Sequence, residues 1–427
     1  MFYTLKDLNF KKFFLKVKKK VVFNQNLFSI ELKKFYEIKN KKLLNNFKKR
    51  NKGLELANAR SNLLDEIILK CYNYYSLKLN KNSKNCKCSI VATGGFGRRE
   101  LAPYSDIDIL FLHSLENKKD LENFVKTVLH TLWDLGLRVG YATRTSKECI
   151  LYSKTKLDVC TSILDSRFVV GDKSLYENLM KKYKSNIVEM YRKKFIKSIF
   201  LERKKRLIET GDTRYLLEPN VKNGKGGIRD LQTLDWIGKF VYKITNLKDL
   251  INYKILDKNS VDSFLKAKNF FWTVRSHLHI ISERPNEQLN FEYQNLIAKK
   301  IGYKKTKALL HVEKFMKDYF FTAKRVSNLI RIYCTLIEDK EKLIPGTEVK
   351  KSKEIKIDNF IIKNKRIDFS TNFTFKNIFL NNYNSFFKIL EIAQQKNLDV
   401  HPKAVRFMLD NIKRIKNKIS GKKEFLL

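Results

Sequence analysis

The segment that constrains this chain most is Val91–Leu112, in which a glycine-rich turn precedes two aspartates at the start of an apolar run. The apolar and β-branched residues after Asp106 predict a strand, whose two-residue repeat puts Asp106 and Asp108 on one face. Upstream, Gly94 and Gly95 leave the backbone bare, so that its N–H groups can approach a phosphate closely. Each feature alone is usually a plain loop or a solvated strand end. Together, at this spacing, they indicate a nucleotide site.

The two carboxylates point to a metal ion. Like charges held side by side repel, and each raises the pKa of the other unless a cation lies between them. Mg²⁺ is the expected cation, because it prefers oxygen ligands, takes one or two protein carboxylates and completes its shell with water and substrate phosphates. Asp106 and Asp108 are therefore candidate metal ligands. Arg98 and Arg99 are candidate phosphate partners, and Ser105 is a further candidate for substrate binding. The chemistry predicted is nucleotidyl transfer.

The string GGFGRRELAPYSDIDIL, from Gly94, resembles the nucleotidyltransferase superfamily that includes DNA polymerase β and the kanamycin nucleotidyltransferases. Within it, the string looks like the bacterial PII uridylyltransferases. A second string, LLEPNVKNGKGGIRDLQTLDWI from Leu216, is similar to another signature of that family. The resemblance covers most of the chain and is thinnest over the first eighty residues. It implies an α+β fold, with a polymerase-β-like core of a small mixed sheet and helices, flanked by a large all-helical domain.

The second string supplies further candidates for substrate binding, namely Lys222, Arg229 and Asp230. Three glycines with basic residues among them do not suit a core, and a charged loop before a helix can present donors to a phosphate at the helix N-terminus. Two other basic residues further along, Arg275 and Arg284, could reach phosphates, but ion pairing is the favoured interpretation. We expect His279 to be a satisfied polar side chain rather than a catalyst.

The resemblance also implies a third carboxylate on a neighbouring strand, which would bind the metal and accept the proton of the attacking group. Asp165, in the β-rich segment Ser162–Val170, is the candidate. Asp158 is the alternative, and the sequence does not choose firmly between them. A plain ion pair between Asp165 and Arg167 would account for the same residues.

We divide the chain into four parts from its patterns. These are a basic helical segment (1–85), the nucleotidyltransferase core (86–172), a helical domain (173–345), and a small hairpin followed by two C-terminal helices (346–427). Within the core, the spacing predicts a helix over 119–135, a strand over 137–143 and a helix capped by Ser146. The first part is predicted to be helical from its start to about Tyr75.

The charge of the chain is strongly positive. Lys and Arg number 88 against 44 for Asp and Glu, a net charge of +44 that would suit a polyanion or membrane surface. Lys and Asn are abundant everywhere, however, which indicates genome bias, so nucleic acid is not the expected partner. Six cysteines without a CxxC pair indicate reduced thiols in a cytoplasmic protein. The chain has no apolar run of roughly eighteen residues, so we expect no membrane span.

The resemblance implies Mg²⁺ as cofactor, with UTP and the signalling protein PII as partners. The expected reaction transfers UMP from UTP to a tyrosine of PII and releases pyrophosphate. No histidine is followed by Asp, so we do not expect the His-Asp hydrolase that removes uridylyl groups in longer relatives, nor the glutamine-sensing domains beyond it. The alternatives are an adenylyltransferase acting on another protein or a small molecule, and a non-catalytic remnant that binds PII or nucleic acid.

Overall fold

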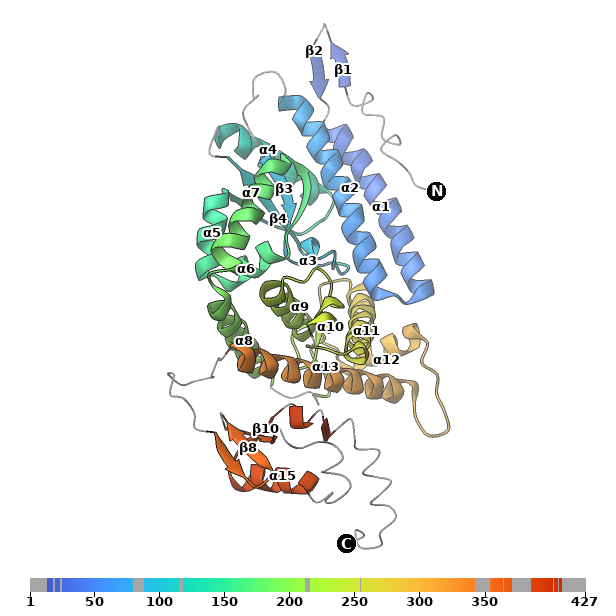
Figure 1. The fold of residues 1–427 in the computed structure, drawn as a ribbon. Helices are drawn as coiled ribbons and strands as arrows, with labels where there is room; N and C mark the ends of the chain where they lie inside the picture. The colour runs from blue at the N-terminus through green and yellow to red at the C-terminus, as the bar shows by residue number, and fades with distance from the viewer. Residues whose placement is uncertain are drawn as a thin grey trace. The chain divides into compact units, whose positions relative to one another are not determined.

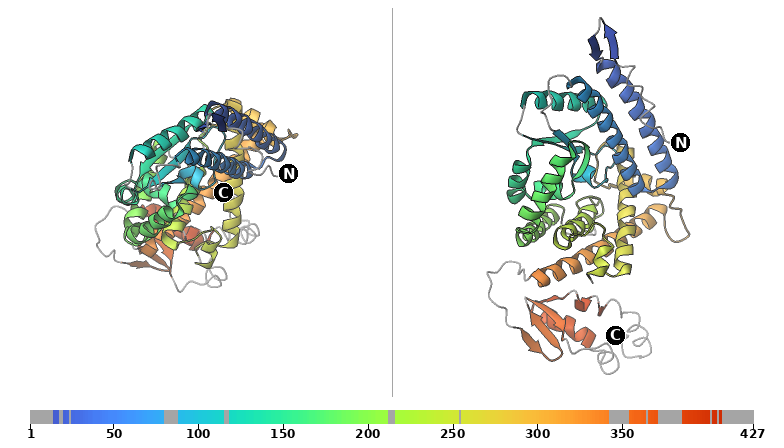
Figure 2. Two further views of the ribbon diagram at one scale, coloured as in Figure 1. Left: turned by 90° about the horizontal axis from the view of Figure 1, so that it is seen from above. Right: turned by 45° about the horizontal axis from the view of Figure 1, so that its top comes forward.

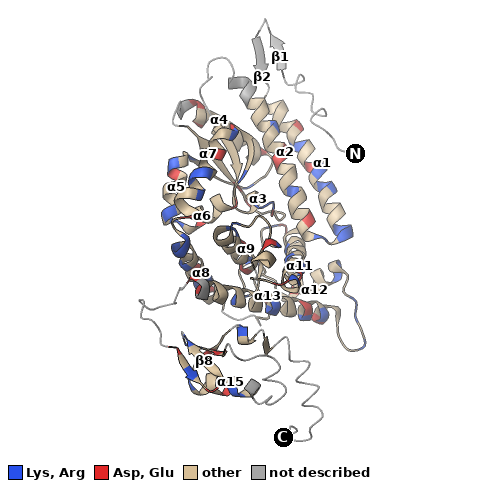
Figure 3. Ribbon diagram, in the orientation of Figure 1, with Lys and Arg blue, Asp and Glu red and all other residues tan. Residues whose placement is uncertain are grey.

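The computed structural model describes residues 14–17, 20–23, 25–79, 88–114, 118–211, 216–253, 255–341, 354–363, 365–370, 385–401, 403–405 and 407–408. The chain forms two compact units, 1–326 and 327–427 (Figure 1). This two-way division does not test the finer division into four parts, which stays a prediction. Lys and Arg lie along most of the helices with Asp and Glu among them (Figure 3), so the positive charge is not confined to one element.

The first described elements are a hairpin and two long helices. Strand β1 (Phe14–Val17) pairs antiparallel with β2 (Lys20–Phe23), so the prediction of helix is wrong for this stretch. Its valines and phenylalanines suit an extended backbone. Helices α1 (Gln25–Arg50) and α2 (Gly53–Leu79) then lie side by side (Figure 2). The predicted apolar stripe of α2 is confirmed, with Leu56, Leu63, Leu64, Ile67 and Ile68 buried.

A four-stranded mixed sheet forms the centre of the first unit. Its order is β5 (Val139–Arg144), β4 (Ile107–His113), β3 (Cys88–Ala92) and β6 (Arg167–Gly171). Strands β4 and β5 are parallel, with α4 (Lys118–Asp134) between them in sequence, and the other pairs are antiparallel. The helical crossover between β4 and β5 and the mixed strand pattern confirm the predicted α+β core.

The two faces of the sheet carry alternate residues of each strand. Ile107, Ile109 and Phe111 of β4 belong to the main apolar core, which they share with residues of α1, α2 and α4. Leu110 and Leu112 are also buried, but outside that core. Successive side chains of a strand point to opposite faces. Asp106 and Asp108 have the parity of Leu110 and Leu112, and so they face away from the main core.

The segment between β5 and β6 is more helical than predicted. Thr145, rather than Ser146, caps α5 (Ser146–Thr155), in a reciprocal capping box with Glu148. Helix α6 (Leu157–Leu164) follows, with Val159, Cys160 and Ile163 buried at helical spacing. The β-rich pattern over 162–170 therefore holds only from Arg167, where β6 begins. Helix α7 (Lys173–Tyr183) then returns to contact β3, β4 and β6.

The remainder of the first unit is helical, as predicted. After a π-helical turn (Lys184–Val188) come α8 (Arg192–Glu209), α9 (Ile228–Tyr242), α10 (Asp249–Asn252), α11 (Lys258–Ser282) and α12 (Phe291–Ile301). Helix α13 (His311–Glu341) begins in this unit, and its residues from Ser327 belong to the second. Helix α9 is buried over most of its length and packs against α6, α8 and α11, while α11 also packs against α2. These contacts fix the helical part on the nucleotidyltransferase core. No helix in the described ranges has the length and apolar character to cross a bilayer.

The second unit holds a small sheet with its own core. Strands β7 (Ile355–Ile357), β8 (Phe360–Lys363) and β9 (Arg366–Phe369) form the predicted hairpin and one strand more, and β10 (Asp399–Val400) pairs with β9. The apolar side chains of α15 (Ser385–Gln395) pack on this sheet. The second predicted C-terminal helix, over 402–419, falls largely outside the described residues.

Candidate active site

The carboxylate pair lies where β4 begins. Asp108 is the second residue of the strand and is half-buried, while Asp106 immediately precedes the strand and is exposed. Within the part of the chain that the structure describes, neither carboxylate accepts a hydrogen bond or forms an ion pair. The two carboxylates lie on the same face and have no partner among the described residues. Such a pair is suited to bind a cation from solution.

Two glycines make room for the Asp108 side chain. A Cβ atom on Gly94 would lie 2.6 Å from Oδ2 of Asp108, and one on Gly140, in β5, would lie 2.9 Å from Oδ1. Gly94 also has a φ of +53°, a conformation that side chains rarely adopt. It opens the short helix α3 (Gly94–Gly97), where the N–H groups of Gly94 and Gly95 meet no acceptor among the described residues. The predicted turn therefore lies directly against the Asp108 carboxylate.

The electrostatics of Asp108 also favour a cation. Burial raises the pKa of its carboxyl group, the negative charge of Asp106 raises it further, and the positive charges of Arg98 and Lys222 oppose the change. A divalent cation beside both carboxylates would offset the first two effects. The donor set fits Mg²⁺, which needs few protein ligands. Among the residues described, no group of three or more His, Cys, Asp and Glu side chains is placed to hold a metal.

Asp165 does not lie on a strand, which corrects the sequence prediction, and its carboxylate has donor partners in the protein, while its role as a metal ligand stays a prediction. It caps the end of α6 instead of lying on a strand, and its side chain is fully buried. Its Oδ2 accepts hydrogen bonds from Arg98 Nη1 and Trp236 Nε1, each at 2.6 Å, and its Oδ1 accepts one from Lys239 Nζ at 2.9 Å. With both oxygens engaged by donors, Asp165 is a structural anchor in this geometry. The alternative, Asp158, is exposed in the first turn of α6.

The proposed ion pair between Asp165 and Arg167 does not form either. Arg167 makes a two-pronged contact with Asp65 of α2, at 2.8 and 2.9 Å. Arg99, the second predicted phosphate partner, lies 3.7 Å from the same Asp65 carboxylate. Both arginines therefore connect the core to α2.

Arg98 is neutralised as well as buried, so it is not a free phosphate partner. Besides Asp165, its Nε donates to Glu100 Oε2 at 2.9 Å, and Glu100 in turn accepts from Lys268 Nζ of α11 at 2.5 Å. Burial acts to raise the pKa of Glu100, but the charges of Lys268 and Arg98 prevail and hold it at about 2. The resulting chain of charges joins the turn after α3 to α9 and α11.

A second network fixes the segment just before the carboxylate pair. Arg275 of α11 donates through Nε to Glu287 Oε2 at 2.9 Å, and its Nη2 lies 3.4 Å from the Ser105 hydroxyl. The ring of His279 contacts the carbonyl of Pro103 and lies 3.5 Å from Glu287. Arg275 is thus ion-paired, as predicted, whereas His279 is only partly satisfied, because its buried Nε2 makes no hydrogen bond among the described residues. Ser105 is positioned beside Asp106 by this contact with α11.

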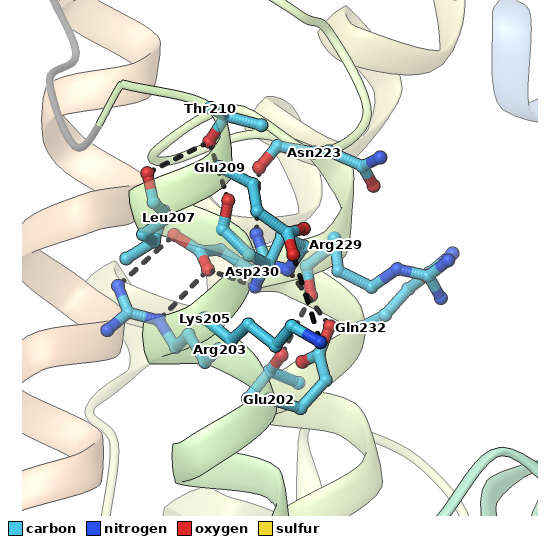
Figure 4. Close-up of polar contacts among 12 residues, drawn as sticks. Glu202, Arg203, Lys205, Leu207, Glu209, Thr210, Asn223, Arg229, Asp230 and Gln232 are labelled. Atoms are coloured by element: carbon cyan, nitrogen blue, oxygen red, sulfur yellow. Dashed lines mark hydrogen bonds and ion pairs between the residues drawn. The ribbon is translucent and has the colours of Figure 1, made fainter.

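Asp230 anchors the glycine loop, although the sequence suggested that it binds substrate. It is fully buried, and its carboxylate accepts from Arg203 Nε and Arg206 Nη2, each at 3.0 Å (Figure 4). The N–H of Gly226 donates to it at 2.9 Å. The carboxylate therefore ties the loop to α8.

The N-terminus of α9 is occupied by the loop itself. The N–H of Ile228 donates to the Val221 carbonyl at 3.1 Å, and that of Arg229 donates to the Lys222 carbonyl at 2.8 Å. The expected phosphate contact with the backbone of this helix end is thus not available. Any phosphate contact from this loop must therefore come from its side chains.

The two basic side chains predicted to bind substrate are Lys222 and Arg229. Among the described residues, the Lys222 ammonium has no hydrogen bond or ion pair. Arg229 donates to Gln232 Oε1 at 2.9 Å, and its guanidinium lies 5.5 Å from the ring centroid of Trp236. Burial, followed by the charge of Arg275, lowers the pKa of Lys222, and burial followed by Arg98 lowers that of Arg229 to about 10. The charge of Glu287 on Lys222 and that of Glu202 on Arg229 oppose these changes in pKa but do not outweigh them.

Sequence reasoning missed the residues that hold the two halves of the site together. They are Glu100, Trp236, Lys239 and Lys268. Glu100 and Trp236 lie inside the two signature strings but were not singled out there. A further local signal was the pair Asp235 and Lys239 of α9, which form an ion pair of 2.8 Å one turn apart. The other partners lie far apart in sequence, and the fold alone brings them together.

This arrangement, a mixed sheet with a glycine turn against an acidic pair at the start of a central strand, defines a nucleotidyltransferase domain. A family model described as a nucleotidyltransferase domain matches residues 76–170. A second, described as GlnD PII-uridylyltransferase, matches residues 194–334, which include the glycine loop and α9. Together the two models cover more than half of the chain.

The curated relatives agree with this assignment. The chain is 38% identical over 321 residues to the bifunctional uridylyltransferase/uridylyl-removing enzyme of Azospirillum brasilense, covering 74% of this chain and 34% of the relative. It is 33% identical over 365 residues to that of Rhodospirillum rubrum, covering 84% and 39%, and 35% identical over 369 residues to that of Bradyrhizobium diazoefficiens, covering 83% and 39%. The chain thus spans little more than a third of the length of these relatives. Over its nucleotidyltransferase and helical parts it belongs to the PII-uridylyltransferase family.

Proposed function

We propose that this chain is a uridylyltransferase that moves UMP from UTP to a tyrosine of the signalling protein PII and releases pyrophosphate. The observation that carries the proposal is the unpartnered pair Asp106 and Asp108, set against the Gly94 turn inside a matched nucleotidyltransferase domain. The family model and the names of the relatives supply the identity of the nucleotide and the acceptor. The described cysteines are free thiols, which suits a cytoplasmic enzyme.

The reaction needs three contributions from the protein. The acceptor hydroxyl attacks the α-phosphorus, losing its proton as the new P–O bond forms, and the bond to the bridging oxygen breaks so that pyrophosphate leaves. Asp106 and Asp108 would hold Mg²⁺, which supplies Lewis-acid stabilisation of phosphate charge when bound. The N–H groups of Gly94 and Gly95, which have no acceptor among the described residues, would donate to a phosphate of the nucleotide. The networks around Arg98 and Arg275 hold the turn and the carboxylates in fixed positions.

A transfer assay tests the proposal. The purified chain with α-³²P-labelled UTP, Mg²⁺ and the PII protein of the same organism should label PII, and EDTA should abolish the labelling. Labelled ATP in the same assay distinguishes uridylyl from adenylyl transfer. The variant Asp108→Asn serves as the inactive control. Absence of transfer to PII from any nucleotide, with a correctly folded chain, would overturn the proposed function.

A further inference from the structure

Four cations of this region act electrostatically on Asp108 or on one another. Arg98 and Lys222 act on Asp108, and Arg98, Arg229 and Arg275 act on Lys222. Two of the four are neutralised, since Arg98 pairs with Glu100 and Asp165 and Arg275 pairs with Glu287. Within the described residues, Lys222 and Arg229 have no carboxylate partner. Both belong to the glycine loop and the first turn of α9.

A partly buried cation without a counter-ion is costly to keep in a folded protein. The loop nevertheless fixes the backbone that carries these two side chains. The Asn220 side chain accepts from the N–H groups of Lys222 at 3.1 Å and Asn223 at 2.7 Å, and Arg229 N–H donates to Lys222 O. Asp230 fixes the other end of the loop to α8. These bonds bring the backbones of Lys222 and Arg229 next to each other without any ligand.

An arriving anion must carry more than one negative charge to satisfy both groups. The Arg229 guanidinium offers a planar fork of donors and the Lys222 ammonium a compact point charge, a combination that suits neighbouring phosphate groups. The charge of Lys222 acts on Asp108, and the guanidinium groups of Arg229 and Arg98 lie 5.5 and 5.8 Å from the ring centroid of Trp236. An anion bound by Lys222 and Arg229 would therefore lie on the side of the predicted metal site. The Gly94 turn, by contrast, offers backbone donors only.

We propose that Lys222 and Arg229 bind the β- and γ-phosphates of the nucleoside triphosphate and hold pyrophosphate as it leaves. This assignment deepens the proposed function and rests on it. When the bond between the α-phosphorus and the bridging oxygen breaks, negative charge grows on the departing pyrophosphate, where the two cations stabilise it. The helical part of the chain thus completes an active site whose carboxylates belong to the sheet.

Binding of inorganic pyrophosphate to the full chain tests the assignment separately from catalysis. Isothermal titration calorimetry in EDTA should show wild-type binding that weakens by about tenfold or more in Lys222→Met and in Arg229→Gln. Lys222→Arg should keep most of the affinity, because it keeps the charge. Lys204→Met, which removes an exposed lysine of α8, is the matched control and should bind like wild type. Thermal melting of each variant checks that it is folded.

The transfer assay then separates the two proposals. Lys222→Met should raise KM for UTP and lower kcat, since it removes charge stabilisation from both the bound substrate and the leaving group. Wild-type affinity for pyrophosphate together with wild-type transfer in Lys222→Met and Arg229→Gln would overturn this assignment and leave the proposed function intact. Pyrophosphate binding that depends on these residues, with no transfer to PII, would support the assignment and overturn the uridylyltransferase proposal.

Discussion

Some charged side chains of this protein stabilise the fold, and others lower its free energy of unfolding. Asp108 belongs to the second group, because the pKa of its carboxyl group is raised in the folded chain by burial and by Asp106. A carboxylate with a raised pKa destabilises the fold once the pH rises above its unfolded value. Asp165 belongs to the first group, since each of its oxygens has a donor.

Asp108→Asn should therefore abolish transfer without weakening the fold. We expect activity to fall by about a hundredfold or more, because a metal ligand is lost. At pH 7 and without metal, the midpoint of thermal unfolding should stay equal or rise, and the gain should vanish near pH 3, where Asp108 is protonated in both states. Calorimetric unfolding at the two pH values measures this. A clearly lower midpoint at pH 7 would instead assign Asp108 a structural role.

Asp165→Asn should damage stability, whereas Asp158→Asn should not. The first change leaves Arg98 and Lys239 buried without their carboxylate, at an expected cost of about 3–5 kcal/mol. The second alters an exposed residue and should stay within about 0.5 kcal/mol. Urea unfolding in EDTA measures both values. Loss of activity in Asp165→Asn with unchanged stability, restored by excess Mg²⁺, would return Asp165 to the role of a metal ligand.

Asp106 and Asp108 could be predicted as metal ligands from the sequence because the two carboxylates are only two residues apart in one strand pattern. The partners of Asp165 are different, since Trp236 and Lys239 lie more than seventy residues further along the chain. The apolar residues around Asp165 in the sequence indicate that its carboxylate is buried. They do not indicate whether a metal ion or an arginine lies beside it. Asp230 is a similar case. Its glycine-rich surroundings suggest a phosphate loop, but its partners, Arg203 and Arg206, lie on another helix.

Helices and loops show where local pattern is sufficient. Long amphipathic helices such as α2, α4 and α11 follow from their apolar spacing, and the strand β4 follows from its apolar residues. The hairpin β1–β2 was missed because short lysine-rich segments satisfy either period. Helix α6 was missed because its isoleucine and valine favour strands, and its packing against α5, α3, α8 and α9 decides the outcome.

A single substitution, at Asp230, can remove the contacts that tie the glycine loop to α8. In Asp230→Asn, Arg203 and Arg206 lose a fully buried counter-ion, and we expect a loss of about 3–5 kcal/mol in stability. Before global unfolding, the loop should also become sensitive to trypsin at Lys222 and Lys225. Asp262→Asn, on the exposed side of α11, is the control and should leave both stability and cleavage unchanged. Wild-type resistance to trypsin in Asp230→Asn would contradict the anchoring role.

The whole chain consists of two units, each with its own apolar core. The core of the smaller unit contains few buried apolar residues, including Phe360, Ile367 and Ile389. Ile367→Ala should cost this unit about 2–5 kcal/mol. In differential scanning calorimetry we expect a lower-temperature transition to shift while the main transition stays in place, and uridylyl transfer below the first transition to persist. A shift of both transitions together would show that the units unfold as one.

Trp236 gives this protein a fluorescent reporter of its own. Its indole N–H donates to Asp165, and its ring lies 5.8 Å from the Arg98 guanidinium and 5.5 Å from that of Arg229. Indole emission is sensitive to nearby charge, so an anion that draws Arg229 towards it should change the wavelength of emission. The chain has three tryptophans, and Trp133 is largely exposed while Trp272 is buried in α11. With Trp133→Phe as background, a stopped-flow spectrometer should record the arrival of pyrophosphate or nucleotide in real time, without any attached dye.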